Sequence, residues 1–584
     1  MIDTKKVLLL LLCTSMLGLS GASEGVAQGK EPKPNVLLIL TDDQGWGDVG
    51  SHGNKLLETP HLDRLAKGST ELERFYVSPV CAPSRASLLT GRYNLRTGTS
   101  WVTHRKEVMR SQEVTIAELL GSHNYRTGYY GKWHNGHQYP TDPIGQGFEQ
   151  FFGFKEGHLN NYFDTRLTHN FQEVETSGYV PDLLADSAIS FIRKKGPFFC
   201  YLAFNTPHSP FQVPEAYFKK YKAKGLDDKN AAVYAMVENI DMNVGRILQA
   251  LRESGKEQET IVIFLSDNGP NGQRYNGGLK GIKASVDEGG VRVPFFIRYP
   301  AGGIESGRVR RQFGAHIDIL PTIAELTGIK VPDSLQIDGR SLLPIIKGKG
   351  IAYPGRAFYT HHVIRELGAI PGAVRTHQYL LTLMPEDTSF YDLLKDPSQE
   401  HDLVDRHPEL VSEYIRKYRE WFGEVTGNGV EPPLVQLGGS PAPLTWLPAP
   451  EASLYGQVAF KGGEGWANDW LVNWNDASDS AVWEVVAKRP TQYRISMQLS
   501  LEKPLVMALE LDGKTYYKKI EGPRQAVQVL NKDRVPRGEV EEMQWPEVVL
   551  ATVHMPAGVH RLKISPAGEV KGELAIKALK LTKL

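Results

Sequence analysis

Short apolar runs alternate with stretches of helical periodicity from Asn35 onward, and this alternation constrains the fold more than any other feature. Strands that are joined through helices pair in parallel, and the helices then cover the faces of the sheet. The clearest runs are NVLLILT, RTGYYG, PFFCYLAF and TIVIFLS. We therefore expect an α/β domain with a mostly parallel sheet flanked by helices.

Each of these runs is followed by residues that can bind ions or transfer protons. In chain order they are Asp42 and Asp43, Lys132 and His134, His208, and Asp267 with Asn268. In open α/β sheets, ligands bind beyond the carboxyl ends of the strands. We therefore expect these residues, although far apart in the chain, to converge on one site.

Two of these strand ends are acidic. Asp42 with Asp43 and Asp267 with Asn268 offer three carboxylates and one amide oxygen, and no cysteine or histidine adjoins either pair. Such a donor set suits a hard cation, with calcium favoured over magnesium. The alternative is that aspartate and asparagine only end strands and cap turns here.

Residues 1–27 have the pattern of a secretory signal peptide. Two lysines precede an apolar run that begins at Val7, and small residues follow that run. We expect export to the periplasm or the exterior. No other apolar run is long enough to cross a bilayer. Lysine plus arginine equals aspartate plus glutamate, at 67 each, so charge gives no reason to expect nucleic acid as a partner.

The chain after the signal peptide keeps two cysteines, Cys81 and Cys200. Exported proteins usually use cysteines in pairs, but nothing in the sequence favours a disulfide between these two. Cys200 lies in an apolar run and is interpreted as a buried, inert thiol. Cys81 lies where a loop enters a predicted helix that ends at Gly91. It is therefore the chemically interesting cysteine.

The start of that helix is suited to an anion. Backbone N–H groups at a helix start bind negative charge, and the helix dipole adds about 0.3–1 kcal/mol. Arg85, Lys132 and Lys283 can add positive charge. The sequence thus predicts an anion pocket that combines a cation site with an unpaired cysteine.

The segment that begins at Cys81 carries the most specific pattern in the chain. CAPSRASLLTGR resembles the sulfatase signature Cys-x-Pro-Ser-Arg-x-x-x-x-Thr-Gly-Arg at every fixed position. Other segments resemble type I sulfatase motifs and occur in family order: TDDQGWGD, GKWH, TPHSP, SDNG and LKGIKASVDEGGVRVP. From about Asn35 to about Pro397, the chain resembles the formylglycine-dependent, arylsulfatase-like members of the alkaline-phosphatase superfamily.

The resemblance implies a role for the unpaired cysteine. In this family a formylglycine-generating enzyme oxidises the motif cysteine to Cα-formylglycine, an aldehyde that hydrates to a gem-diol. One hydroxyl attacks sulfur and expels the alcohol, and the other then collapses the hemiacetal and releases sulfate. Cys81 is therefore expected to be the precursor of the nucleophile, with the maturation enzyme as a partner.

The resemblance also implies roles for the other motif residues. The expected calcium ligands are Asp42, Asp43, residue 81, Asp267 and Asn268. Arg85 would orient the diol, and Lys132 and Lys283 would hold the sulfate oxygens. His134 would act as the base. His208 would protonate the leaving oxygen, or stabilise it together with Lys283.

Three further histidines are candidates for contact with the substrate, namely His158, His361 and His362. The chain departs from the family pattern at Asn135, where leucine is usual, and at Ile282 and Ala284, where glycines are usual. These departures leave every expected catalytic side chain in place, but they can reshape the sulfate pocket.

Several domains are expected along the chain. They are a signal peptide over 1–27, a catalytic domain over 33–350, a small C-terminal subdomain over 351–428, a Pro/Gly-rich linker over 429–452 and an antiparallel β-sandwich over 453–584. The last segment resembles galactose-binding-like carbohydrate-binding modules in rhythm only. Its tryptophans, Trp466, Trp470, Trp474, Trp483 and Trp545, are candidate platforms for sugars, although most tryptophans in such sheets are core.

The expected function is hydrolysis of a sulfate ester on a sulfated oligo- or polysaccharide. One alternative is a phosphate or phosphonate ester hydrolase on the same fold, which assays on matched esters would distinguish. Another is an inactive polysaccharide-binding protein on a degenerate scaffold, against which the complete catalytic set argues. Because the motifs define the sulfate pocket alone, the sugar, its linkage and the sulfate position stay open.

Overall fold

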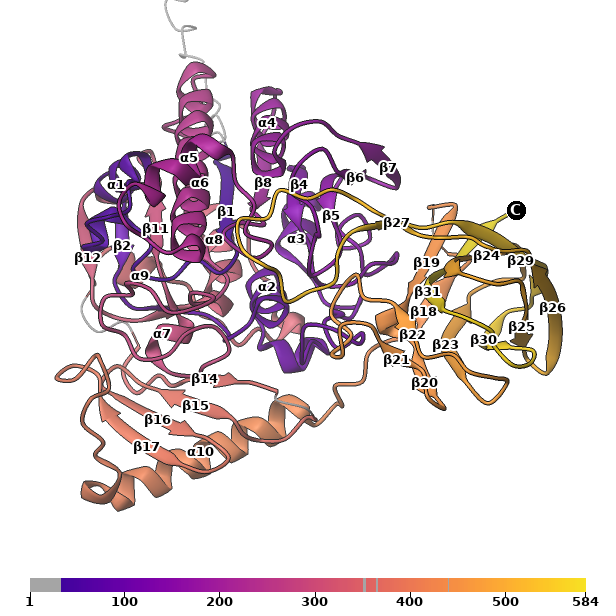
Figure 1. Ribbon diagram of the computed structural model, residues 1–584. Helices are drawn as coiled ribbons and strands as arrows, with labels where there is room; N and C mark the ends of the chain where they lie inside the picture. Colours follow the sequence, from indigo (N-terminus) through magenta and orange to yellow (C-terminus); the bar gives the residue numbers. More distant parts are fainter. Residues whose placement is uncertain (1–32, 350–352, 364–365, 440) are drawn as a thin grey trace, which may run out of the picture. The chain divides into compact units, whose positions relative to one another are not determined.

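The computed structural model describes residues 33–584, apart from 350–352, 364–365 and 440 (Figure 1). The expected signal peptide, residues 1–27, lies outside the described residues. Within the described part of the chain, no helix combines the length and the apolar character that a membrane span requires.

A ten-stranded sheet is the centre of the first domain. In spatial order its strands are β12 (Arg308–Arg310), β2 (Thr70–Leu72), β11 (Phe295–Arg298), β9 (Thr260–Ser266), β1 (Asn35–Thr41), β8 (Phe198–Ala203), β4 (Arg126–Lys132), β5 (Gln150–Phe154), β6 (Arg166–His169) and β7 (Gln172–Glu175). The strands from β9 to β5 are parallel. Antiparallel pairing with β11 and β6 extends the sheet at both edges. The expected α/β domain is confirmed.

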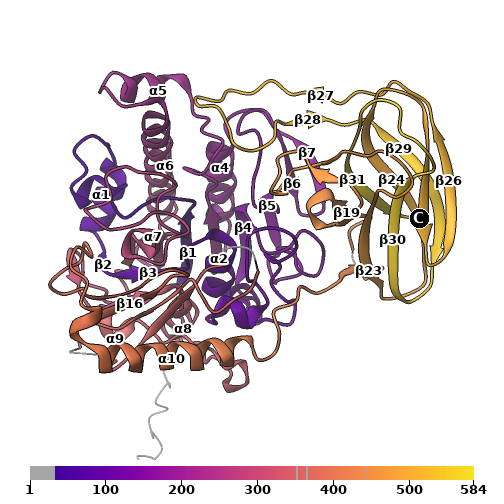
Figure 2. The ribbon, with the colours of Figure 1, turned by 60° about the horizontal axis from the view of Figure 1, so that its bottom comes forward.

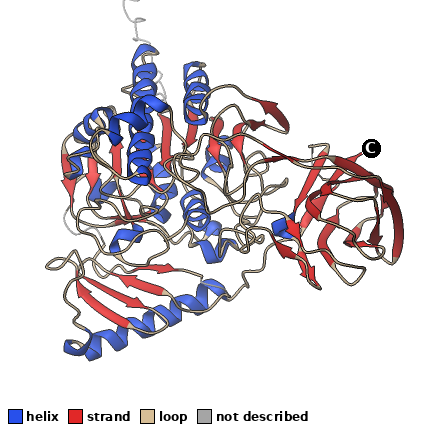
Figure 3. Ribbon diagram, viewed as in Figure 1, coloured by secondary structure: helices blue, strands red, loops and turns tan. Residues whose placement is uncertain are grey.

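Helices cover both faces of this sheet, because alternate residues of a strand point to opposite sides. Leu37 and Ile39 of β1 belong to one apolar core, and Val36, Leu38 and Leu40 belong to another. The first core includes α1 (Pro60–Lys67), α4 (Val180–Arg193) and α6 (Asp228–Glu253), and the second includes α2 (Cys81–Thr90), α3 (Ile116–Gly121) and α8 (Ile319–Leu326). Figure 3 shows these helices around the strands.

A small antiparallel subdomain follows. Its sheet has the order β14 (Phe358–His361), β15 (Gly372–Arg375), β16 (Tyr379–Leu383) and β17 (Thr388–Asp392). Helix α10 (Pro408–Thr426) lies along this sheet (Figure 2). Tyr418 and Trp421 of the helix share an apolar core with Val374 and Phe390 of the strands. This unit corresponds to the C-terminal subdomain that the resemblance implies.

Two further sheets form the last part of the chain. One has the order β18 (Val435–Leu437), β23 (Ser480–Ala487), β30 (Gly558–Pro566), β25 (Leu505–Leu511) and β26 (Lys514–Ile520); the other has β21 (Ala459–Phe460), β22 (Leu471–Val472), β31 (Leu574–Lys583), β24 (Thr491–Leu501) and β29 (Glu547–Met555). One apolar core joins them and contains Trp474 and Trp483. The β-sandwich is therefore confirmed, and these two tryptophans are core residues rather than exposed platforms.

Strands run through the segment that was expected to be a linker. β18 pairs with β23, and β19 (Leu444–Pro448) pairs with β31. Leu437 and Leu447 are fully buried in the sandwich core. The prediction of a linker over 429–452 is wrong for these strands. They are too short to show a period of two, and the neighbouring prolines and glycines mask them.

The sandwich packs against the α/β domain, since residues 34–584 form one compact unit. Glu451 of the sandwich is buried and forms ion pairs with Arg105, at 3.0 Å, and with His137, at 3.1 Å. The ring of His104 contacts the carbonyl oxygens of Pro450 and Glu464, both at 3.0 Å. Buried charge thus joins the two parts of the molecule.

The pair of His137 and Glu451 predicts a dependence of stability on pH. Burial alone would lower the pKa of His137, but the interaction with Glu451 outweighs burial and raises this pKa from 6.5 to about 9. The protonated histidine therefore stabilises the fold fully below pH 6.5, and the contribution is lost as the pH rises through about 9. We expect His137→Asn to flatten the decline of the melting temperature over this pH range, measured by calorimetry.

A matched control is His401→Asn, which removes an exposed histidine. The control should keep the decline of the wild-type protein. Equal declines in wild type and His137→Asn would contradict the assignment of this buried pair.

Candidate active site

The strand ends meet at one edge of the large sheet. Because β9, β1, β8 and β4 are parallel neighbours, their carboxyl ends lie side by side. In this spatial order the residues at or just after these ends are Asp267 and Asn268, Asp42 and Asp43, His208, and Lys132 with His134. The structure therefore brings together residues that are far apart in the sequence. Asp43 and Asp267 are 224 positions apart, yet the backbone N–H of Asp43 donates to Asp267 Oδ1 at 3.2 Å.

Helix α2 brings Cys81 to the same edge. Cys81 is the first residue of the helix, and Gly91 ends it with a φ of 69°, a left-handed conformation that disfavours any side chain. Ser84 holds the loop before the helix: its hydroxyl accepts from the N–H of Ser78 at 3.0 Å and donates to the Ser78 carbonyl at 3.1 Å. All residues of α2 are buried, so packing on every side determines where Cys81 lies.

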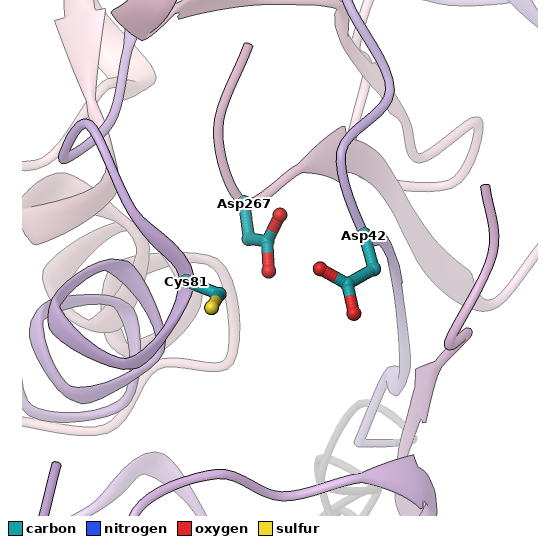
Figure 4. A group of neighbouring side chains, drawn as sticks. All are labelled: Asp42, Cys81 and Asp267. Carbon is teal, nitrogen blue, oxygen red and sulfur yellow. The ribbon is translucent and has the colours of Figure 1, made fainter. Parts of the chain in front are cut away.

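Cys81 faces two of the carboxylates (Figure 4). Asp42, Cys81 and Asp267 each place one potential ligand atom within 4.8 Å of the other two, and Asp42, Asp43 and His208 do the same. Burial raises the pKa of the Cys81 thiol in spite of the lysines nearby. The thiol is therefore protonated at neutral pH and is not an activated nucleophile.

Two lysines neutralise the aspartates that follow β1. Lys132 Nζ is 2.6 Å from Asp42 Oδ2, and Lys283 Nζ is 2.6 Å from Asp43 Oδ1. The side chain of Lys132 is 1% exposed, whereas those of Lys283 and His208 are 18% and 13% exposed. The cluster therefore opens to solvent on the side of Lys283 and His208.

Arg85 fixes the carboxylate that follows β9. Its Nε and Nη2 donate to Asp267 Oδ2 at 3.1 and 2.7 Å, and its Nη1 donates to the carbonyl oxygen of Lys132 at 2.7 Å. Both side chains are fully buried. The guanidinium of Arg85, which lies on α2, thus connects the end of β9 with the end of β4.

These contacts control the charges of the cluster. Burial alone would raise the pKa of Asp42 and of Asp43, but Lys132 and Lys283 respectively help to lower both values. Burial and the negative charge of Asp42 raise the pKa of Asp267. The carboxylates therefore repel one another, and a further positive charge among them would relieve this repulsion.

Three side-chain oxygen atoms of the residues that follow β1 and β9 are buried without a hydrogen-bond partner among the described residues. They are Asp42 Oδ1, Asp43 Oδ2 and Asn268 Oδ1. Asn268 Nδ2 donates to Asp43 Oδ1 at 2.8 Å, which directs the amide so that its oxygen is left over. Unpaired buried oxygens are costly. A calcium ion, which takes carboxylate and amide oxygens, would satisfy all three, so the donor set fits the expected cation.

His134 is held as a neutral proton acceptor. Its Nε2 is 2.8 Å from the carbonyl oxygen of Val102, and because a carbonyl can only accept, Nε2 carries the proton. Nδ1 is buried and has no partner among the described residues. Burial, reinforced by the charge of Lys132, lowers the pKa of His134 well below its ordinary value. Nδ1 is therefore unprotonated at neutral pH and can accept a proton there.

The backbone at the site is specialised. His134 and Asp43 have φ values of 63° and 68°, a region that costs free energy for residues other than glycine. Gly157 lies so close to His134 that a Cβ at this position would be 2.1 Å from Nε2. Gly157 was missed by sequence analysis, because a glycine without its structural neighbours carries no functional signal.

Asn135 has a structural role. Its Nδ2 donates to the carbonyl oxygens of Ala82 at 3.0 Å and of Glu107 at 3.2 Å, which a leucine cannot do. It therefore ties the His134 loop to the first turn of α2, beside Cys81. Ala284, in a position where glycine is usual, has a φ of 70°.

The three substrate candidates lie in different surroundings. The ring of His158 is 5.7 Å from that of His208, and its Nε2 is buried without a partner among the described residues. His361 contacts the carbonyl oxygen of Gly368 at 2.7 Å, and the ring of His362 packs 5.0 Å from that of Trp101. The structure thus joins His158 to the cluster, while a role for His361 and His362 stays a prediction.

Cys200 lies inside β8 and is fully buried, and both cysteines are free thiols. Burial raises its pKa strongly. Within the described residues Cys200 is therefore an inert core residue, and no disulfide constrains Cys81.

Comparisons with known proteins agree with this geometry. The sulfatase family model matches residues 34–329, and the model for the C-terminal region of N-sulphoglucosamine sulphohydrolase matches residues 283–419. The chain is 33% identical to the N-acetylgalactosamine-6-sulfatase of Canis lupus familiaris, over 57% of this chain and 69% of that protein. It is 30% identical to the arylsulfatase A of Homo sapiens, over 69% of this chain and 86% of that protein.

Solved structures give the same result. Ps i-CgsB in complex with k-i-k-neocarrahexaose is similar with a TM-score of 0.63 and 30% identity, over 67% of this chain and 92% of that one. The structure of BT4656 with D-glucosamine-2-N,6-O-disulfate, at 20% identity and a TM-score of 0.56, shares the fold. With the signature at Cys81, the buried charge cluster and a family model that covers half of its length, this chain belongs to the sulfatase family.

Proposed function

We propose that this sulfuric ester hydrolase removes sulfate from a sulfated carbohydrate, with Cys81 converted to formylglycine and with calcium as cofactor. The observation that carries the proposal is the single buried cluster that joins Cys81 to Asp42 and Asp267 and to their partners, Lys132 and Arg85. An anion that entered this cluster would meet a helix start, lysines and a cation site together.

In this proposal the calcium ligands are Asp42, Asp43, Asp267 and Asn268. The three unpaired buried oxygens among them support a cation of this kind. A bound calcium supplies Lewis acidity and neutralises charge on the sulfate group. Magnesium is less suitable because it demands a tighter octahedral shell and gives up water reluctantly.

Residue 81 supplies the nucleophile as formylglycine, a hydrated aldehyde in place of a thiol. The raised pKa of the buried thiol supports a precursor role, since a thiol nucleophile needs a lowered pKa. Because the whole of α2 is buried, the maturation enzyme would act on the segment from Cys81 to Arg85 before the chain folds. Export to the periplasm or the exterior belongs to the same proposal.

The other side chains hold charge and move protons. Lys132 and Lys283 hold sulfate oxygens when the anion replaces part of their contact with the aspartates. His134 takes a proton at Nδ1, because Nε2 is already committed to Val102. His208 lies at the opening with Lys283, so the leaving oxygen would emerge beside these two residues.

The names of related proteins support a carbohydrate substrate. N-acetylgalactosamine-6-sulfatase and the neocarrahexaose complex of Ps i-CgsB both refer to sugars. The test is to screen desulfation of defined sulfated oligosaccharides, with matched phosphate and phosphonate esters in parallel. Turnover of small aryl sulfates without any sulfated saccharide would contradict the carbohydrate proposal, and preference for the phosphorus esters would favour the alternative.

The role of residue 81 predicts a sharp difference between the two cysteines. Cys81→Ala should lower kcat by roughly 10³-fold or more, as expected when a nucleophile is removed. Cys200→Ala, the matched control, should stay close to wild type in kcat. Peptide mass spectrometry of the active enzyme should detect an aldehyde at position 81, and full activity with an intact thiol there would refute the mechanism.

The cation site predicts that calcium stabilises the protein. At a concentration one hundred times its Kd, calcium should add about 2.7 kcal/mol to the free energy of unfolding. Asp43→Asn should weaken calcium binding in titration calorimetry and remove most of the thermal shift. Asp186→Asn, which alters an exposed aspartate, is the control. Binding of equal strength in all three proteins would show that the cation site is assigned wrongly.

A further inference from the structure

One segment of the sandwich leaves its own domain and reaches the opening of the active site. Residues 521–546, here called the arm, connect β26 with β29 and contain the short strands β27 (Val527–Gln528) and β28 (Met543–Gln544). Figure 2 shows the arm running from the sandwich towards α5 (Glu215–Lys222). The arm joins the edge strands of the two sandwich sheets, and it is longer than most connections between strands.

The arm is fastened to the segment that follows His208. Gln212 Nε2 donates to Asp533 Oδ1 at 2.7 Å. The N–H of Arg534 donates to the carbonyl oxygen of Phe211 at 3.0 Å, and its Nη2 donates to that of Val213 at 2.9 Å. These contacts repeat along consecutive residues, so the arm has a defined place beside the opening.

Glu539 is the arm residue that reaches the catalytic cluster. The hydroxyl of Ser209 donates to Glu539 Oε1 at 2.7 Å. The carbonyl of the same serine accepts from His208 Nδ1 at 2.6 Å. Against the effect of burial, interaction with His158, the hydrogen bond from Ser209 and interaction with His208 lower the pKa of Glu539 to about 2. Glu539 is therefore an anion beside the two histidines at the opening.

A second residue of the sandwich, Asn468, also contacts the residues at the opening of the active site. Asn468 Nδ2 donates to the carbonyl oxygen of His158 at 2.8 Å, and Lys577 Nζ in turn contacts the carbonyl of Asn468. The sandwich thus holds the backbone of His158 beside the cluster, while the buried Nε2 atom of its ring has no partner among the described residues.

Glu539 also borders an open cavity beside the arm. This cavity has a volume of about 370 Å³ and is lined by Glu539 together with Trp470, Lys461 and Met543. An apolar and aromatic wall with a few polar groups is typical of a site for a sugar ring. One carboxylate therefore separates the opening at His208 from a space that can hold a further ring.

We propose that Glu539 determines substrate specificity. It accepts a hydrogen bond from a neutral hydroxyl of the saccharide whose sulfate is removed, and it excludes a second anionic group from that position. The neighbouring sugar lies in the cavity beside Trp470. This inference rests on the proposed function. It implies that residues of the sandwich line one side of the active site.

The distribution of charge supports this orientation. At the sulfate end Lys132 and Lys283 are paired with Asp42 and Asp43, and a bound cation would make this end net positive, whereas the arm presents Glu539. Arg537, the nearby arginine of the arm, is paired with Asp533 at 2.7 Å, so it does not cancel this anion. A substrate with one sulfate fits both ends, and a second sulfate or carboxylate beside Glu539 would be repelled.

The test separates the hydrogen bond from the charge. Glu539→Ala removes both, and Glu539→Gln removes the charge but keeps an acceptor. The control is Glu521→Gln at the exposed start of the arm, where Glu521 pairs with Lys519. Values of kcat and KM are measured on 4-nitrophenyl sulfate, on the monosulfated saccharide that wild type turns over fastest in a panel of hexosamine and carrageenan sulfates, and on its disulfated counterpart.

We expect Glu539→Ala to lower kcat/KM for the monosulfated saccharide by about 10- to 100-fold, the effect of a lost hydrogen bond to a charged group. The loss on 4-nitrophenyl sulfate, which has no hydroxyl, should be smaller by at least about tenfold. Glu539→Gln should lose less on the monosulfated saccharide and should shift the preference towards the disulfated one. The Glu521→Gln control should match wild type throughout.

Equal losses on the aryl sulfate and the saccharide, or no loss on either, would overturn the inference. An unchanged preference between mono- and disulfated saccharides in Glu539→Gln would overturn the exclusion of charge. If Glu539→Ala does not fold, Ser209→Ala, which releases the carboxylate, should show the same selective loss at smaller size. Wild-type protein that turns over only 4-nitrophenyl sulfate would instead refute the proposed function itself.

Discussion

The buried pairing of three carboxylates with three basic side chains is the constraint on which this structure depends. Removing a charge from water costs several kcal/mol per ion in a protein interior, and only a close partner offsets that cost. Lys132, Lys283 and Arg85 supply these partners at 2.6 to 2.7 Å. The pairing is incomplete, because three buried side-chain oxygens of this cluster have no hydrogen-bond partner among the described residues. The same incompleteness makes the cluster a site for a cation and an anionic substrate.

The parallel centre of the sheet makes this pairing possible. Four adjacent strands end at one edge, so short polar segments after each strand share a small volume without long loops. Helix α2 completes the site from one face, because its buried surroundings leave Cys81 a single position. Backbone strain at Asp43 and His134 is tolerated because β1 and the ion pair with Lys283 hold Asp43, and β4 and the contact with Val102 hold His134.

The sandwich contributes contacts on the substrate side of the active site. Its ion pairs through Glu451 fasten it to the α/β domain, and its arm reaches the opening marked by His208. A separate binding module would act through local concentration alone. Contacts such as Ser209 with Glu539 instead place a sandwich residue within hydrogen-bond distance of the catalytic segment, so the two parts of the molecule are expected to recognise one substrate together.

The sequence by itself determined the α/β domain, the sandwich and the residues at the strand ends, because the apolar runs and the polar residues that follow them are local patterns. The Cys81 signature and the order of the other motifs led to the family for the same reason. Tertiary structure alone decided that 435–437 and 444–448 are strands, that Gly157 makes room for His134, and that Glu539 lies beside Ser209, 330 positions away in the chain. Short edge strands, a lone glycine and a lone glutamate carry no periodic signal, and their roles arise only from neighbours that folding brings to them.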